Sequence, residues 1–284
     1  MSASGGDGRT NPVGSTGARP GAVGFLTDTT LCIGCKACEV ACKQWNGLPM
    51  DDVGFTGFSY DNTVDLGATT WRHVAFVERT GADGDAGPTA LAPFPSAWLM
   101  MSDICKHCVH AGCLQACPTG AIIRTEFDTV VIQQDVCNGC GYCVPACPFG
   151  VPQLDSSDHK AHKCTLCYDR LKDDLEPACA KACPTDSIQF GVVAELMPRA
   201  TERVAALEER GVGGAYIYGD RAVGGTHGID GLNAFFVLTA PPEVYNLPAA
   251  PELPQDKTLP AFVTTAVAAL GLGLAAVAAL RGGR

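Results

Sequence analysis

Sixteen cysteines are the residues of this chain best suited to chemistry. They form four groups of four with none left over: Cys32, Cys35, Cys38, Cys42; Cys105, Cys108, Cys113, Cys117; Cys137, Cys140, Cys143, Cys147; and Cys164, Cys167, Cys179, Cys183. Two groups are spaced C-x2-C-x2-C-x3-C, and three groups end in Cys-Pro. Thiolates at this spacing hold cubane iron–sulfur clusters. The pattern therefore predicts a carrier of electrons.

The spacing has a physical reason. Three thiolates two residues apart on a tight loop turn inward onto one cube, and the backbone N–H groups of the loop stabilise its reduced state. A fourth cysteine three residues further on has entered the next element and faces elsewhere. In two-cluster ferredoxins this fourth thiolate ligates the partner cluster, and the proline after it redirects the chain.

Two other uses of cysteine fit less well. Disulfide scaffolds are typical of short secreted chains, and closely spaced C-x2-C-x2-C runs have poor geometry for pairing. Structural zinc usually takes two separated C-x2-C pairs, a pattern that only the last group approaches. Taken alone, that group would be ambiguous between zinc and iron–sulfur.

The order of the groups predicts how they share clusters. The two middle groups, joined by a predicted hairpin within 121–136, have the layout of one two-cluster ferredoxin unit at 104–150. The outer groups would form a second unit from 24–46 and 158–191, split by the insertion of the first. Cross-ligation then gives four sets: set 1 is Cys32, Cys35, Cys38 and Cys183; set 2 is Cys42, Cys164, Cys167 and Cys179; set 3 is Cys105, Cys108, Cys113 and Cys147; set 4 is Cys117, Cys137, Cys140 and Cys143. The alternative is local closure, in which the four cysteines of each sequence group ligate one cluster by themselves and the sets are the four groups.

The elements that must position these groups indicate an α+β fold. We expect strands at 71–79, 187–191, 215–218 and 234–238, and a surface helix at 199–210 that begins after Pro198 and ends at Gly211. The insertion at 47–101, with aromatic Phe55, Phe58 and Tyr60, is predicted to be a docking or covering lobe.

Four segments follow from composition. Residues 1–22 are rich in Gly, Ser and Thr, which predicts a disordered tail without an export signal. A four-cluster domain spans 23–240, and 241–260 is predicted to be a stiff proline-bearing spacer. Residues 261–280 carry no charge, and twenty helical residues reach about 30 Å, the thickness of bilayer hydrocarbon. A transmembrane helix is favoured over a buried core helix because the segment is terminal and is followed by Arg281 and Arg284.

Charge and motifs exclude other functions. Twenty basic and thirty acidic residues give a formal charge of −10, which disfavours a nucleic-acid surface and favours protein docking faces. The chain has no glycine-rich phosphate cradle for a nucleotide or flavin. No histidine is predicted to be a ligand, and Lys36 and Lys163 are expected to be solvated rather than to tune a cluster.

The motifs resemble those of the four-cluster electron-transfer (beta) subunits of molybdenum or tungsten oxidoreductases, over most of residues 24–255. The runs C-I-G-C-K-A-C from Cys32 and A-C-K-Q-W-N from Ala41, with H-C-V-H-A from His107, are similar to the formate dehydrogenase branch of the membrane-bound, respiratory type. Cysteine stands at all sixteen positions, whereas relatives acting on nitrate commonly have one tryptophan there. Cys42 is followed by Lys43 rather than proline, as in the first group of this family.

The resemblance implies four [4Fe-4S] clusters and a relay role without substrate chemistry on this chain. The implied partners are a large molybdopterin or tungstopterin subunit that oxidises formate, and an integral-membrane cytochrome b or quinone-reactive subunit in the lipid bilayer. The same relay would also suit a sulfur-oxyanion, polysulfide or sulfoxide reductase. An alternative from another class is a zinc-stapled, membrane-tethered interaction protein. Arg281 and Arg284 place the C-terminus in the cytoplasm and the cluster domain outside.

Overall fold

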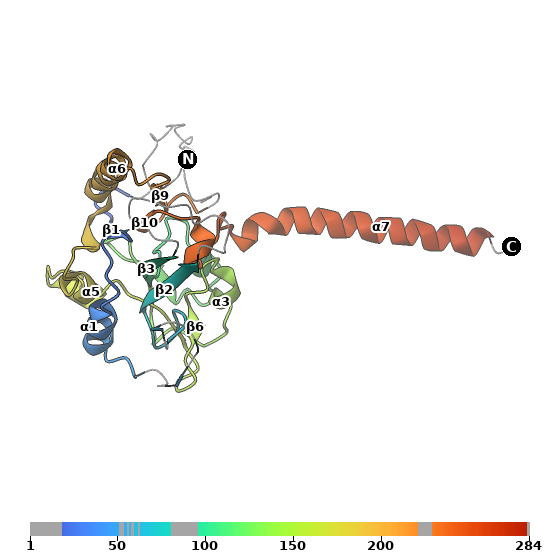
Figure 1. The fold of residues 1–284 in the computed structure, drawn as a ribbon. Helices are drawn as coiled ribbons and strands as arrows, with labels where there is room; N and C mark the ends of the chain where they lie inside the picture. Colours follow the sequence, from blue (N-terminus) through green and yellow to red (C-terminus); the bar gives the residue numbers. More distant parts are fainter. Residues whose placement is uncertain are drawn as a thin grey trace, which may run out of the picture.

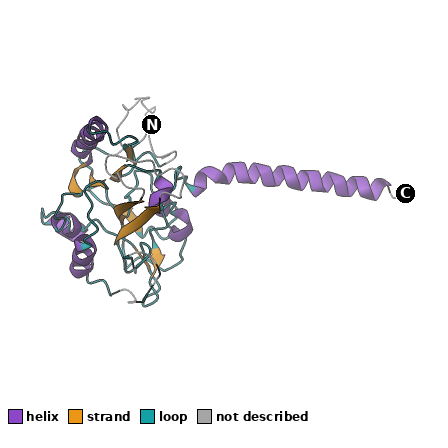
Figure 2. Cartoon of the chain, viewed as in Figure 1, coloured by secondary structure: helices purple, strands orange, loops and turns teal. Residues whose placement is uncertain are grey.

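The computed structural model describes residues 19–50, 54–55, 57, 60–61, 63–80, 96–220 and 229–282 (Figure 1). Its strands are β1 Val23–Asp28, β2 Arg72–Thr80, β3 Ser96–Ile104, β4 Ile122–Arg124, β5 Val130–Ile132, β6 Gln153–Leu154, β7 Ala161–His162, β8 Ile188–Val192, β9 Tyr216–Tyr218 and β10 Ala234–Leu238. Its helices are α1 Ala37–Asn46, α2 Gly112–Gln115, α3 Cys143–Ala146, α4 Tyr168–Lys172, α5 Ala178–Lys181, α6 Val193–Glu209 and α7 Thr258–Gly282, with 3₁₀ turns η1 Pro242–Tyr245 and η2 Pro254–Lys257. This mixed helix and strand content agrees with the α+β prediction (Figure 2).

The main sheet joins the two ends of the cysteine-bearing region. Its strand order is β8-β1-β10-β9, with β1 parallel to β10 and antiparallel to β8. Phe25 of β1 lies opposite Phe190 of β8 on one side and Ala234 of β10 on the other. All five residues of β10 are buried, so this apolar strand anchors the sheet in the core. The strands expected at 187–191, 215–218 and 234–238 are confirmed.

Three hairpins surround this sheet. The longest joins β2 and β3, with Arg72 opposite Ile104 and Thr80 opposite Ser96. The strand expected at 71–79 is thus confirmed as β2. The hairpin expected between the two middle cysteine groups is also confirmed, because β4 and β5 pair antiparallel from Ile122 opposite Ile132.

Helix α6 begins earlier than the sequence indicates. It starts at Val193, six residues before the expected Arg199, and Pro198 lies inside it. The prediction that proline would mark the helix start was wrong because tertiary packing outweighs the cost of proline. Leu196, Met197 and Ala200 are buried with sheet residues such as Phe235. Their burial offsets the lost backbone hydrogen bond.

The segment expected to be a stiff spacer packs against the core instead. Tyr245, Leu247 and Leu253 are all buried in a cluster with Phe236 of β10. The Tyr218 hydroxyl also donates a hydrogen bond to the carbonyl of Pro248 at 2.7 Å. The prolines therefore shape a strap along the domain rather than a rod away from it.

Helix α7 extends away from the rest of the chain (Figure 1). Its stretch Pro260–Arg281 is the one described helix that is long and apolar enough to span a membrane, and none of it is buried. At the other end of the chain, Ala22 is buried and its N–H donates to the carbonyl of Arg19, so residues 19–22 of the expected tail pack with the domain. Residues 1–18 of the predicted tail and Phe58 of the insertion lie outside the described residues.

Candidate metal centres

The four thiols of set 1 line one cavity. Cys32 and Cys35 line it from the loop before α1, Cys38 from the first turn of α1, and Cys183 from the turn after α5. Burial is the main cause that raises the pKa of the Cys32 thiol, and the nearby thiolates of Cys183 and Cys35 raise it further. A cysteine 151 positions away in sequence is therefore an electrostatic neighbour of the first group, as cross-ligation requires.

The thiols of set 2 come from the two outer groups. Burial is the main cause that raises the pKa of Cys164 well above its ordinary value, and the thiolates of Cys42, Cys167 and Cys179 add to it. Helix α1, which carries Cys42, packs against α5, which carries Cys179. The structure thus brings these four side chains together in the interior, where all four are buried.

Sets 3 and 4 repeat this arrangement in the middle of the chain. Burial raises the pKa of Cys108 above its usual range, and its thiol neighbours of set 3 raise it further: Cys147, Cys105 and Cys113. Burial likewise raises the pKa of Cys143 to about 11, with the set 4 thiolates of Cys137, Cys140 and Cys117 contributing. Helices α2 and α3 pack together here, as α1 and α5 do for the outer groups.

One backbone feature recurs in the first C-x2-C loop of each of the four cysteine groups. The residue directly before the second cysteine has a positive φ: 67° at Gly34, 43° at His107, 73° at Gly139 and 59° at Leu166. This left-handed conformation costs a non-glycine residue free energy, so its retention at His107 and Leu166 indicates that the loop shape is required. The left-handed residue turns the loop tightly so that its two thiols can face the same side.

Hydrogen-bond donors surround the sulfurs. The backbone N–H of Leu166 donates to Cys164 Sγ at 3.2 Å. The hydroxyls of Thr119 and Thr185 lie 3.6 and 3.8 Å from the sulfurs of Cys117 and Cys183, in two matching Cys-Pro-Thr runs. Donors to thiolate sulfur raise the reduction potential of a bound cluster.

The β2–β3 hairpin contributes residues that sequence reasoning missed. Arg72 Nη2 donates to Cys179 Sγ at 3.2 Å, and Arg72 Nη1 donates to the Ser102 carbonyl at the same distance. The Ser102 hydroxyl lies 3.2 Å from Cys38 Sγ. Arg72 belongs to the insertion at 47–101, predicted to be a docking or covering lobe, and Ser102 directly follows that insertion on β3. The hairpin therefore supplies side chains to sets 1 and 2. Only the long-range contacts reveal this, because Arg72 lies far from any cysteine in the sequence and the cysteine nearest to Ser102 is Cys105, which belongs to set 3.

Two buried donors beside the cysteines lack a protein acceptor. His107 Nδ1 accepts the Val130 N–H at 3.0 Å, so the ring proton sits on Nε2, which has no hydrogen-bond partner among the described residues. Arg72 Nε is likewise buried without one. Unpaired buried donors are costly, and acceptor sulfides at these positions would satisfy them. The thiol sets and these donors fit an anionic iron–sulfur cluster.

A single metal ion is a different case. Within the described part of the chain, no three Cys, His, Asp or Glu side chains lie close enough together to hold one ion. A four-iron cube spreads its thiolates more widely than one ion does.

Two lysines expected to be solvated have distinct environments. Lys163 is almost fully buried, so the expectation of a solvated side chain was wrong for this residue. Lys36 is half-buried and forms ion pairs with Glu39 at 3.4 Å and Asp61 at 3.7 Å. Sequence spacing did not distinguish the two because each lies next to a cysteine in a polar run.

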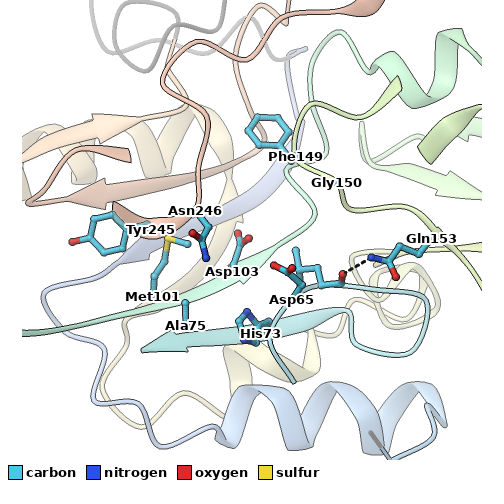
Figure 3. Close-up of a pocket in the computed structure, with 11 residues that line it drawn as sticks. Asp65, His73, Ala75, Met101, Asp103, Phe149, Gly150, Gln153, Tyr245 and Asn246 are labelled. Carbon is cyan, nitrogen blue, oxygen red and sulfur yellow. Dashed lines mark hydrogen bonds between the residues drawn. The ribbon is translucent and has the colours of Figure 1, made fainter. Parts of the chain in front are cut away.

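A polar cavity of about 190 Å³ lies over the β2–β3 hairpin, separate from the cysteines (Figure 3). Its lining includes Asp65, His73, Asp103 and Gln153. His73 Nε2 lies 2.8 Å from Asp61 Oδ2, and the Asp103 carboxylate pairs with the buried ammonium of Lys106. His73 and Asp103 of this cavity are therefore engaged in structural pairs.

Comparison with known proteins identifies relatives of the same kind. A family model described as a 4Fe-4S dicluster domain matches residues 96–193. The nitrate-inducible formate dehydrogenase iron–sulfur subunit of Escherichia coli is 42% identical over 241 residues, which cover 84% of this chain and 76% of the relative. The formate dehydrogenase iron–sulfur subunit of Haemophilus influenzae is 41% identical over 89% of this chain and 77% of its own. One of the chains of the anaerobic dimethyl sulfoxide reductase of Escherichia coli is 34% identical over 61% of this chain and 75% of its own.

Proposed function

Because the chain belongs to the family of formate dehydrogenase iron–sulfur subunits and serves as an electron-transfer relay, we propose that its sixteen cysteines hold four [4Fe-4S] clusters. In this proposal electrons enter from a large molybdenum- or tungsten-pterin subunit that oxidises formate. They leave toward a cytochrome b or quinone-reactive subunit in the membrane. The chain itself performs no chemistry on formate.

Cross-ligation is the arrangement that the thiol neighbours support. Cys183 is a neighbour of Cys32, and Cys147 of Cys108, although each pair belongs to two different sequence groups. Local closure would instead associate Cys147 with its own group, at Cys137, Cys140 and Cys143. The assignment of the sixteen cysteines to sets 1–4 rests on this single observation, the proximity of thiols from different sequence groups.

The same contacts support two interleaved ferredoxin units. Strand β1, which precedes the first cysteine group, pairs antiparallel with β8, which follows the last group. The outer unit is thereby closed by a sheet although the 111 residues of 47–157 separate its halves. The α1–α5 and α2–α3 contacts then occupy equivalent places in the two units. We assign 24–46 with 158–191 to one unit and 104–150 to the other.

Contacts between sets support a linear order from set 1 to set 4. Arg72 interacts with Cys38 of set 1 and Cys179 of set 2. Cys105 of set 3 influences the pKa of Cys164 of set 2, after burial and Cys42, and Cys143 of set 4 influences that of Cys113. Both end sets reach the surface, because Cys35 and Cys140 are exposed. Electrons would therefore enter and leave through sets 1 and 4.

The residues of the chain have simple roles in this relay. When bound, such clusters exchange electrons without forming or breaking bonds to a substrate. The cysteines hold them at fixed positions, and the buried residues around sets 2 and 3 exclude water. Donors such as the Leu166 N–H and the Ser102 hydroxyl stabilise negative charge on the sulfurs.

Helix α7 provides the proposed attachment to the membrane. Its exposed apolar surface and length suit a single-pass anchor next to a membrane partner. Arg281 and Arg284 follow the span, whereas Lys257 precedes it. The positive-inside rule then places the C-terminus in the cytoplasm and the cluster domain on the extracytoplasmic side.

The sulfoxide reductase relative supports the same relay role with a different catalytic partner. That match is lower in identity and covers less of this chain than the formate dehydrogenase matches. Identifying the copurifying large subunit would decide between the two substrates. The family match favours iron–sulfur clusters over the zinc alternative, which would give colourless protein without acid-labile sulfide.

Paired cysteine substitutions test the ligand sets. The full chain, purified anaerobically in detergent with its copurifying subunits, should contain about four irons per set, about sixteen in all. Cross-ligation predicts that Cys147→Ser and Cys108→Ser alter the same electron paramagnetic resonance (EPR) signal, while Cys140→Ser alters another. If Cys147→Ser and Cys140→Ser alter one signal together, local closure is correct and the four sets are wrong.

A further inference from the structure

Two basic side chains are buried between neighbouring cysteine sets. Arg72 on β2 is 1% exposed, and Lys163, directly before Cys164, is 3% exposed. Charged side chains of this kind are almost never fully buried unless a partner offsets the cost. Their partners therefore indicate what each charge does.

Arg72 lies between sets 1 and 2. It donates a hydrogen bond to Cys179 of set 2, and its further electrostatic partners are Cys38 of set 1 and Cys164 of set 2. The guanidinium also lies over the Phe25 ring, 4.8 Å from its centroid. Thiolates of two sets thus share one guanidinium, which stays charged at any physiological pH.

Lys163 occupies the equivalent place between sets 2 and 3. Its ammonium contacts the carbonyls of Val130 and Cys164 and hydrogen-bonds the Cys105 side chain. Its thiolate partners are Cys105 and Cys113 of set 3 and Cys164 of set 2. All three of these hydrogen-bond partners act as acceptors, which suits an ammonium.

The absence of a carboxylate distinguishes these two cations. Neither Arg72 nor Lys163 forms an ion pair with an acidic residue in the described ranges. Lys106 is equally buried and lies near set 3, but its charge is paired with Asp103 at the edge of the polar cavity (Figure 3). Lys106 therefore adds little net charge, whereas Arg72 and Lys163 each add a full one.

We propose that Arg72 and Lys163 are tuning residues, each of which raises the reduction potential of the clusters on both of its sides. The proposal rests on the proposed function, because it requires clusters in sets 1, 2 and 3. An electron that arrives at a set adds one negative charge, and no bond forms or breaks. A fixed cation nearby stabilises that charge, and water-poor surroundings screen it weakly. The unpaired Nε of Arg72 offers one more donor to the same negative region.

Two variants that each remove one positive charge test the proposal. Arg72→Gln and Lys163→Gln are introduced into the full chain, purified anaerobically with its copurifying subunits, and titrated against potential with EPR detection. Arg72→Gln should lower the midpoint potentials of the clusters in sets 1 and 2. Lys163→Gln should lower those of the clusters in sets 2 and 3, so one cluster is affected by both variants. We expect the ratio of reduced to oxidised cluster at a fixed potential to fall at least about tenfold, a shift of about 59 mV for one electron.

Matched controls separate charge from structure. Lys181→Gln removes an exposed cation two residues from Cys179 and should leave the midpoints unchanged, since water screens it. Arg72→Lys keeps the charge, so its midpoint potentials should stay close to those of the wild-type chain. If Arg72→Lys lowers the midpoints as far as Arg72→Gln, lost packing is the cause and the proposal is overturned.

Iron content distinguishes the remaining outcomes. A wild-type chain with far fewer irons than four per set would overturn the proposed function itself. Variants with full iron content and unchanged midpoints would overturn only the tuning role. If Arg72→Gln loses iron, Lys163→Gln carries the same test for sets 2 and 3, and unchanged midpoints there reject the proposal.

Discussion

At the scale of single residues, the shape of each cysteine loop depends on one left-handed position. Glycine fills that position at Gly34 and Gly139, and no L-residue adopts it as readily. At Gly139 the space is closed as well, because an added Cβ would lie 2.0 Å from the backbone carbonyl oxygen of His159. The glycine is therefore required both for its conformation and for its lack of a side chain.

Gly139→Ala should impair set 4. The positive φ alone costs an alanine about 1–2 kcal/mol, and the clash with His159 must also displace backbone. We expect a lower melting temperature and the loss of about four irons per chain, measured by calorimetry and metal analysis.

Gly213→Ala serves as the matched control. Gly213 has open space around its Cβ position and no positive φ, so iron content and melting temperature should stay unchanged. A Gly139→Ala protein with full iron and an unaltered melting temperature would refute the argument from loop shape.

At the scale of elements, packing changed what several segments do. The 241–257 segment and the start of α6 are held by buried side chains such as Tyr245 and Leu196, against the local preference of proline. Helix α7 is the opposite case. Its side chains contact little beyond the neighbouring η2 turn, so its apolar surface is free for lipid or another membrane helix.

Removing residues 258–284 should detach the chain from membranes without harming the cluster domain. The helix buries none of its membrane-length span, so iron content and melting temperature of the remainder should match those of the full chain. Fractionation with a carbonate wash measures attachment, and metal analysis measures integrity. The full-length chain is the control and should resist the wash. A truncated chain that remains in the membrane pellet would contradict an anchoring role for α7.

At the scale of the whole molecule, the proposed line of sets has two surface ends and a buried middle. Cys35 and Cys140 are exposed at its ends, whereas set 2 is buried throughout. Leu253, a few residues before α7, packs next to Gly112 and the carbonyl of Ala146, close to Cys113 and Cys143. The α7 end of the chain is therefore near sets 3 and 4, which suits electron exit on the membrane side.

The proposed sidedness rests on the charges that flank α7. A reporter active only in the cytoplasm, fused after Arg284, should be active, because Arg281 and Arg284 resist translocation. A second fusion after Lys257 lacks the helix and reports the side of the cluster domain, where the cytoplasmic reporter should be silent. An inactive fusion after Arg284 would reverse the assigned orientation.

The sequence by itself determined the donors, their spacing, most strands and the apolar C-terminal helix. These features are local, since a C-x2-C loop, an alternating strand or an uncharged stretch of twenty residues is written in consecutive positions. The tertiary structure alone decided that Lys163 is buried, that Pro198 lies inside a helix, and that Arg72 reaches Cys179 across 107 positions. Burial and charge contacts depend on which distant segments meet, and that information is spread over the whole core rather than held in any one motif.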